Sequence, residues 1–253
     1  MTITNNIRYI GVDDTTLDLF EGQYIIPNGI SYNSYLILDE KVTIMDTVDA
    51  RMTKEWWENL EAALEGRTPD YLVVQHMEPD HASLVAEVME RFPKLQVVAT
   101  QRALQMMPLF FEGADFSARS IAVSEGDTLS LGAHTLRFFL APMVHWPETM
   151  VTYLEEEHTL FSGDAFGTFG GVINGITDSE ACMQGADSSS DTFSQFRDEM
   201  IRYYSNIVGK YGGPVEKAIE KLSSLPINYI CSTHGPVWHE KIGYVVENYL
   251  KMA

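Results

Sequence analysis

The sequence has few cysteines, few cations and no long apolar run. Its two cysteines, Cys182 and Cys231, form no CxxC pair, which argues against a disulfide framework, a zinc ribbon or a rubredoxin-type iron site. Such cysteine usage is typical of a reducing cytoplasm. No apolar stretch approaches the roughly 20 residues that span a bilayer. The N-terminus lacks a basic region followed by an apolar run, so no signal peptide is predicted.

Positive charge is scarce: 17 lysines and arginines face 36 acidic residues, and the formal net charge is −19. This balance excludes nucleic acid and anionic membrane surfaces as favoured partners. A partner with a basic face stays possible, although solubility is the simpler explanation of the negative charge. The 253 residues, of which 45% are hydrophobic, are enough for one sizeable core. No repeat or linker interrupts them, so a single domain over residues 1–253 is predicted.

Short apolar runs alternate with segments of helical spacing. Trp56, Leu60 and Leu64 recur every four residues, which predicts a helix over 52–65. Helices are also predicted over 81–92, 101–112, 192–208 and 214–225, and strands over 31–38, 41–45, 71–74, 95–100 and 228–232. The first two strands are separated only by Asp39 and Glu40, as in a hairpin, and 119–161 holds several short strands. Strands with interleaved helices predict an α/β layered fold.

Residues that can bind metal follow four of the predicted strands. The ends of strands are where ligands gather in α/β sheets. Four histidines and three carboxylates stand at these places: His76, Glu78, Asp80 and His81 in HMEPDH, His145 in APMVHWPE, Asp164 in FSGDAFG and His234 in STHGPVW.

Each of these residues has a simpler interpretation on its own. Asp80 could cap the following helix, Asp164 could form an Asx-turn, and a lone histidine is more often a hydrogen-bonded structural residue. The combination favours a metal site, because H-x-E-x-D-H fixes four positions and two of them are the scarce histidine. The remaining histidines fit no such pattern and are interpreted as structural or surface groups: His134, His158 and His239.

The motif resembles the H-x-H-x-D-H signature of the metallo-β-lactamase superfamily, with Glu78 in place of the middle histidine. A carboxylate in place of a neutral imidazole makes the site harder and more anionic, which suits iron in two oxidation states better than zinc. Three carboxylates leave two ferrous ions with a net charge of +1 and two ferric ions with +3. Such a site can accept dioxygen or nitric oxide between its metals.

The ligand order and the phrases PNGISYNSYLI, HMEPDHAS, FSGDAFG and STHGPVW resemble the flavodiiron family over nearly the whole chain. The resemblance implies a metallo-β-lactamase-like αββα sandwich and a diiron centre. It also implies that His76, Glu78 and His145 hold one iron, that Asp80, His81 and His234 hold the other, and that Asp164 bridges them. The residue matching His81 is not a ligand in some family members.

Aromatic residues near this motif set have two interpretations. Tyr203 or Tyr204 is similar in position to a tyrosine near the diiron site of the family, where it would act from beside the metal ligands. Tyr32 and Trp146 would line the pocket. For each of them, a plain core aromatic is an equally good interpretation.

Full flavodiiron proteins continue into a flavodoxin domain with FMN, and neither that domain nor FMN is expected in this chain. Without a donor, a diferrous site holds two of the four electrons that dioxygen reduction to water needs. The expected function is therefore that of a non-haem diiron protein that binds dioxygen or nitric oxide and acts as an oxygen or redox sensor. Within the family, this resembles the flavodoxin-less branch linked to chemotaxis signalling.

Two alternatives stay open. The first is a dioxygen or nitric oxide reductase that takes electrons from a separate flavodoxin, flavoprotein or rubredoxin. The second is a zinc hydrolase of the metallo-β-lactamase superfamily, against which Glu78 argues. The expected partners are thus a diatomic gas and either a signalling protein or an external electron donor. Whether the chain forms the family's head-to-tail homodimer also stays open, because the reason for that dimer is weaker when no flavin domain is expected.

Overall fold

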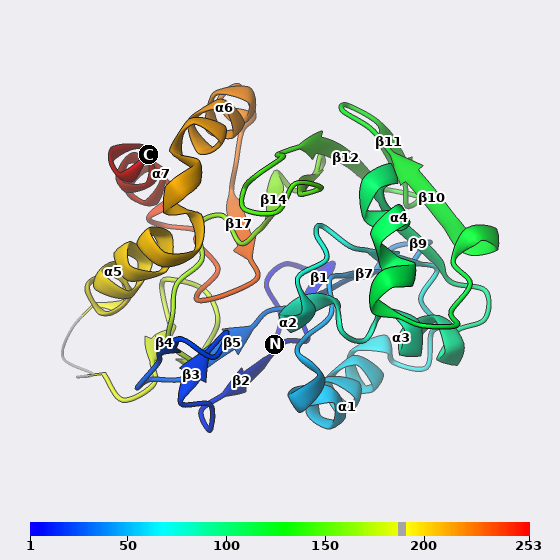
Figure 1. The fold of residues 1–253 in the computed structure, drawn as a ribbon, viewed down its shortest axis with the longest axis horizontal. Helices are drawn as coiled ribbons and strands as arrows, with labels where there is room; N and C mark the ends of the chain where they lie inside the picture. The colour runs from blue at the N-terminus through cyan, green and yellow to red at the C-terminus, as the bar shows by residue number, and fades with distance from the viewer. Residues whose placement is uncertain (187–190) are drawn as a thin grey trace.

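A computed structural model describes residues 1–186 and 191–253 of the chain. Two β-sheets lie face to face in the middle, with helices on both outer sides (Figure 1). The first sheet has the order β1-β6-β7-β8-β9-β10. Its strands are β1 (Ile7–Tyr9), β6 (Tyr35–Ile37), β7 (Thr43–Met45), β8 (Tyr71–Val73), β9 (Gln96–Thr100) and β10 (Ser120–Val123). From β7 to β10 the neighbours are parallel.

The second sheet has the order β11-β12-β13-β14-β17. It consists of β11 (Thr128–Ser130), β12 (Thr135–Leu140), β13 (Met150–Leu154), β14 (Thr159–Gly163) and β17 (Tyr229–Ser232). Only β14 and β17 pair in parallel. Every residue of β13 and β14 is buried, as expected for strands covered on both faces. The predicted αββα sandwich is confirmed.

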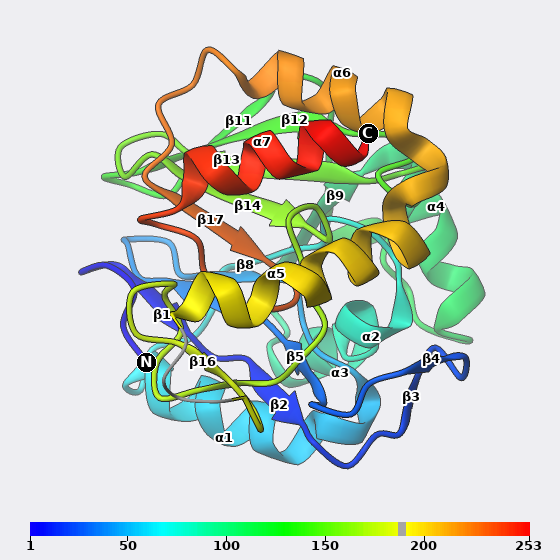
Figure 2. The same cartoon turned by 90° about the vertical axis from the view of Figure 1, so that its left-hand side faces the viewer.

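The outer helices fall into two sets. Beside the first sheet lie α1 (Thr53–Leu64), α3 (Val85–Arg91) and α4 (Gln101–Phe110), and over the second lie α5 (Thr192–Tyr203), α6 (Gly212–Leu222) and α7 (Ile242–Met252) (Figure 2). Trp56, Leu60 and Leu64 of α1 are buried, so the four-residue spacing marks the face that packs on the core. In the described part of the chain, no helix has the length and apolar character that crossing a bilayer requires.

Short elements complete the fold. The helix α2 (Pro79–Ala82) precedes α3, and a π-helical turn, η3 (Tyr204–Val208), directly continues α5. Small two-stranded sheets pair β2 (Val12–Asp14) with β5 (Ile30–Tyr32), β3 (Leu19–Phe20) with β4 (Tyr24–Ile25), and β15 (Val172–Ile173) with β16 (Cys182–Met183). The remaining short helices are η1 (Ala50–Met52), η2 (Ser117–Arg119) and η4 (Gly209–Tyr211).

The predicted strand over 31–38 is wrong as one element. It divides at Asn33 and Ser34 into β5, which pairs with β2, and β6, which pairs with β7. The cause is a contact far along the chain, because the Asn33 amide donates to the backbone oxygens of Ser232 and Gly235 at 2.9 and 2.8 Å. The predicted hairpin therefore survives only as β6 and β7.

Two predicted helices are also divided. The segment 81–92 contains the end of α2 and then α3, and the segment 192–208 changes from α-helix to π-helix after Tyr203. The final helix α7 has no counterpart among the predicted elements. Its face contributes Val245 and Tyr249 to the core.

Candidate metal centre

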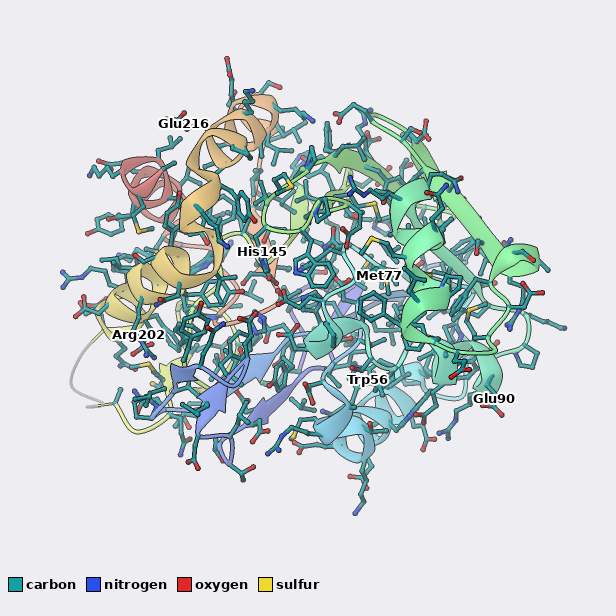
Figure 3. All side chains as sticks on the ribbon, in the orientation of Figure 1. Trp56, Met77, Glu90, His145, Arg202 and Glu216 are labelled. Atoms are coloured by element: carbon teal, nitrogen blue, oxygen red, sulfur yellow. The ribbon has the colours of Figure 1, made fainter. Side chains whose placement is uncertain are left out.

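Loops at one edge of the sandwich bring all seven predicted ligand residues together. His76 and Glu78 follow β8, Asp80 and His81 lie on α2, and Asp164 directly follows β14. His145, in the connection between β12 and β13, lies near the middle of the molecule, between the two helical layers (Figure 3). His234 follows β17. All but His145 are buried, and the His145 side chain is only 12% exposed.

The residues form two groups. The first group is His76, Glu78, His145 and Asp164, and the second group is Asp80, His81 and His234. In the first group, His145 Nε2 lies 2.7 Å from Glu78 Oε2 and 2.9 Å from Asp164 Oδ2. His76 Nε2 lies 3.4 and 3.3 Å from the same two oxygens. Both histidines of this group thus converge on Glu78 Oε2 and Asp164 Oδ2.

The second group converges on Asp80 and on the other oxygen of Asp164. His81 Nε2 lies 3.4 Å from Asp80 Oδ1 and 3.3 Å from Asp164 Oδ1. His234 Nε2 lies 3.2 Å from Asp80 Oδ2 and 3.8 Å from Asp164 Oδ1. Asp164 therefore presents one carboxylate oxygen to each group, which is the arrangement of a bridging ligand.

The donor set fits metal ions. Ligand atoms about 2.1 Å from a common ion are separated by roughly 3.0–3.4 Å, and the separations above scatter around that range. Asp80 Oδ1 and Oδ2, His81 Nε2 and His234 Nε2 are buried, and none has a hydrogen-bond partner in the described residues. Buried polar atoms are almost always satisfied, so atoms left without partners and aimed at one another indicate cations between them.

Contacts behind the ligands fix their orientation. His234 Nδ1 donates to the backbone oxygen of Ser31 at 2.7 Å, which leaves Nε2 to face Asp80. The Thr233 hydroxyl donates to Asp164 Oδ1 at 2.5 Å. Asp46 Oδ1 accepts from the backbone N–H of Gln75 at 2.8 Å, next to His76. Such contacts hold metal ligands in their binding conformation before an ion arrives.

The electrostatics of the centre also favour cations. Burial lowers the pKa of His76, but the Asp164 and Glu78 carboxylates outweigh it and raise the pKa well above the usual value. Against burial, the carboxylates similarly raise the pKa of His145 and of His234 to about 9. Burial opposes ionisation of Glu78, yet the neighbouring histidines lower its pKa to about 2. Glu78 thus stays ionised and attracts positive charge to this point.

Comparison with known proteins agrees with this geometry. Residues 30–235 match the family described as ODP family beta lactamase. The chain belongs to this family.

Relatives of this ODP family member include the anaerobic nitric oxide reductase flavorubredoxin of Vibrio vulnificus, 32% identical over 99% of this chain and 49% of the relative. The flavodiiron protein from Giardia intestinalis has a TM-score of 0.85 and 29% identity over 99% of this chain and 58% of that one. The rubredoxin oxygen:oxidoreductase from Desulfovibrio gigas has a TM-score of 0.87 and 29% identity over 99% and 60%.

These matches confirm the predicted resemblance to the flavodiiron family and its metallo-β-lactamase-like fold. The chain spans about half the length of the curated relatives it matches.

The two neighbouring tyrosines of this ODP family member face different surroundings. The Tyr203 ring lies 5.5 Å from the ring of His234, and its buried hydroxyl has no partner in the described residues. Burial, followed by the charges of Asp164, Glu78 and Asp80, raises its pKa well above the usual value. Tyr204 instead packs on Tyr249 at 5.0 Å. Only Tyr203 therefore lies beside the centre.

The other predicted pocket aromatics also adjoin ligands. The Tyr32 ring is 5.9 Å from His234, and the Trp146 ring is 6.3 Å from His76. The remaining histidines lie in local polar contacts. His134 Nδ1 is 2.9 Å from Asp39, and His158 Nδ1 is 2.8 Å from the Tyr153 hydroxyl. The ring of His239 stacks on Tyr229 at 4.3 Å.

Sequence reasoning missed four residues around the centre: Glu21, Asp46, Glu148 and Thr233. Partial burial and the neighbouring Glu78 carboxylate raise the pKa of Glu21 to about 8. Glu148 accepts from the backbone N–H of Met77. Thr233 and Glu148 stand next to or near a ligand histidine in STHGPVW and HWPE. Their position within those motifs is the sequence feature that could have identified them.

Proposed function

We propose that this chain holds two iron ions and uses them to bind and reduce a diatomic oxidant, dioxygen or nitric oxide. The observation that carries the proposal is the position of Asp164, whose two oxygens face two separate ligand groups. His76, Glu78 and His145 hold one ion, and Asp80, His81 and His234 hold the other. Glu78 and the other carboxylates favour iron over zinc, because hard oxygen donors stabilise an ion that changes oxidation state.

When bound, two ferrous ions supply two electrons and open coordination positions for a small oxidant. The protein supplies the surroundings. Phe20 packs its ring against His234 at 5.5 Å, and Phe169 packs against Tyr203 at 5.1 Å, so aromatic side chains exclude water from the second group. Exclusion of water strengthens the electrostatic contacts within the site.

Tyr203 acts as a hydrogen-bond donor and keeps its proton. Its phenol is kept neutral by burial and by the carboxylates around it. Because no described residue accepts from the hydroxyl, it is free to donate a hydrogen bond to a small molecule in the pocket. Preorganised donors of this kind stabilise negative charge that develops during a reaction.

The electron donor follows from the names of the relatives, a flavorubredoxin and a rubredoxin oxygen:oxidoreductase. We infer that a reduced flavoprotein or rubredoxin delivers electrons to the centre. The sensor interpretation, with a signalling partner linked to chemotaxis, differs in one respect: the centre would react once and then stay oxidised. A cytoplasmic location and a homodimer stay predictions, as does the extent of the domain over residues 1–253.

The test is metal analysis followed by kinetics. Protein purified without oxygen from iron-replete cells should contain close to two irons per chain, and two zincs with hydrolase activity would overturn the proposal. The diferrous protein is then mixed with dioxygen or nitric oxide in a stopped-flow spectrometer, with and without a reduced flavodoxin and its reductase. Multiple turnovers with the donor support the reductase. One oxidant consumed per centre, whether or not donor is present, supports the sensor.

A further inference from the structure

Glu148 is a buried acid close to the centre, and it is not one of the proposed metal ligands. It lies three positions after His145, in HWPE, and is 3% exposed. Its Oε1 accepts the backbone N–H of Met77 at 2.9 Å. Met77 stands between His76 and Glu78, so the contact is made to the peptide chain from which two members of the first group extend.

Two more contacts make this a junction of three segments. The N–H of Met150 donates to the backbone oxygen of Gln75 at 3.0 Å. The Thr100 hydroxyl donates to the backbone oxygen of Glu148 at 3.1 Å. The loops that carry His76 and Glu78 on one side, and His145 on the other, are thus fastened to each other and to the end of β9.

The second group is held by other residues. The backbone oxygen of His81 accepts from the N–H and the hydroxyl of Thr47 at 2.8 and 3.0 Å. His234 is oriented by Ser31. No hydrogen bond of Glu148 in the described residues reaches Asp80, His81 or His234. Loss of Glu148 should therefore affect the two groups unequally.

We propose that Glu148 is a positioning residue for the first group, and this inference rests on the proposed function. The side chains of His76 and Glu78 extend to the same place from the two sides of Met77, because His76 Nε2 lies 3.4 Å from Glu78 Oε2. Fixing the Met77 amide therefore sets the direction of both His76 and Glu78. Glu148 Oε2 is buried with no partner in the described residues. Burying an unpaired oxygen destabilises the fold, so stability alone does not explain an acid at this position.

Three variants test the inference. Glu148→Ala removes the acceptor, whereas Glu148→Gln keeps an oxygen for the Met77 N–H. The matched control is Asp178→Ala, since Asp178 is 6% exposed and accepts from the backbone N–H groups of 239–241, away from both groups. Asp178→Ala should lower the midpoint of thermal unfolding and leave the metal centre intact.

Two readouts are combined. The first is hydrogen exchange at the Met77 amide in metal-free protein, which should be about tenfold or more faster in Glu148→Ala and close to wild type in Glu148→Gln and Asp178→Ala. The second is anaerobic titration with ⁵⁷Fe followed by Mössbauer spectroscopy. In Glu148→Ala one site should lose about 10- to 100-fold in affinity while the other keeps its affinity. Glu148→Gln should keep both sites.

The outcomes separate this inference from the proposed function. Unchanged Met77 exchange and two equal irons in Glu148→Ala would overturn the positioning role. If Glu148→Ala does not fold, Glu148→Gln decides, because loss of one iron from that variant contradicts a role based on the acceptor oxygen. A wild-type protein that binds no iron overturns the proposed function, and the exchange measurement then still tests whether Glu148 holds the Met77 amide.

Discussion

The hydroxyl of Thr233 donates a hydrogen bond of 2.5 Å to Oδ1 of Asp164. This oxygen faces His81 and His234, whereas Oδ2 faces His76 and His145. Thr233 immediately precedes His234 on the loop after β17. The bond therefore couples the orientation of the shared carboxylate to the segment that carries one of the ligands.

Asp164→Asn should disturb both metal sites, whereas His145→Ala should disturb one. An amide has a single acceptor oxygen and no charge, so it cannot serve both groups as the carboxylate does. His145 contacts only the first group. Iron per chain and the Mössbauer spectrum measure the result. An Asp164→Asn protein that kept both irons and full reactivity with oxygen would show that Asp164 does not bridge.

Thr233→Val should weaken the centre without removing it. Valine has nearly the shape of threonine but cannot donate to Asp164, so iron affinity should fall by about tenfold and unfolding stability by about 1 kcal/mol. Thr43→Val is the matched control, because the Thr43 hydroxyl is buried without a partner in the described residues. That variant should be at least as stable as wild type in denaturant titrations. Equal iron affinity in both variants would contradict the coupling.

Tyr203→Phe and Tyr204→Phe should differ although the two residues are neighbours. Tyr203→Phe removes the neutral donor beside the centre, so it should keep two irons but slow the reaction with the oxidant by about 100-fold, the lower end of the range for a lost stabilising donor. Tyr204→Phe should react like wild type. Stopped-flow absorbance with either gas measures the rate, and equal rates for the two variants would remove Tyr203 from the mechanism.

A substitution at Gly167 tests the same tyrosine in a second way. A Cβ at this position would lie 3.0 Å from the backbone oxygen of Asp164 and 3.2 and 3.4 Å from two atoms of the Tyr203 ring, a tight fit on both sides. Because the ring yields more easily than the backbone, Gly167→Ala should displace the ring and reproduce part of the Tyr203→Phe defect, and loss of iron in this variant would show that the Asp164 segment moved instead. Gly213→Ala is the control, because a Cβ there meets nothing within 4 Å. Iron content and reaction rate are measured together, and an unchanged rate in Gly167→Ala would contradict the prediction.

Asp13→Asn should stabilise the protein at neutral pH. Burial, more than the nearby Glu55, raises the pKa of Asp13 from 3.8 to about 6 against the favourable N–H of Val172. The folded state then binds the proton more tightly, so this contribution to stability is complete below about 3.8 and is lost as the pH rises through about 6. The gain in Asp13→Asn at pH 8 should be at most about 3 kcal/mol and should vanish near pH 3.5.

The neighbouring Asp14 provides a control of opposite sign. Burial opposes its ionisation, but hydrogen bonds from Thr16 and the ion pair with Arg51 lower its pKa. Asp14→Asn should therefore cost stability at neutral pH, and the difference from wild type should shrink in acid. Denaturant titrations between pH 3.5 and 8 compare the two variants. Parallel pH curves for both would show that the half-buried carboxyl of Asp13 does not control the dependence.

Local sequence determined the elements whose packing face follows from spacing alone. The helix α1 appears as predicted because Trp56, Leu60 and Leu64 have only one side on which to be buried. The strand over 31–38 could not be predicted correctly, because the Asn33 contacts that divide it reach residues about 200 positions away.

The sequence by itself determined which residue types gather as candidate metal ligands, because few side chains can hold a cation and their order along HMEPDH is distinctive. Tertiary structure decided how they are divided, since only packing turns the two oxygens of Asp164 toward different groups. It also separated Tyr203 from Tyr204, which are chemically identical but point to different sides of a helix. The role of Glu148 has the same origin, because the direction of a side chain depends on contacts from distant parts of the chain.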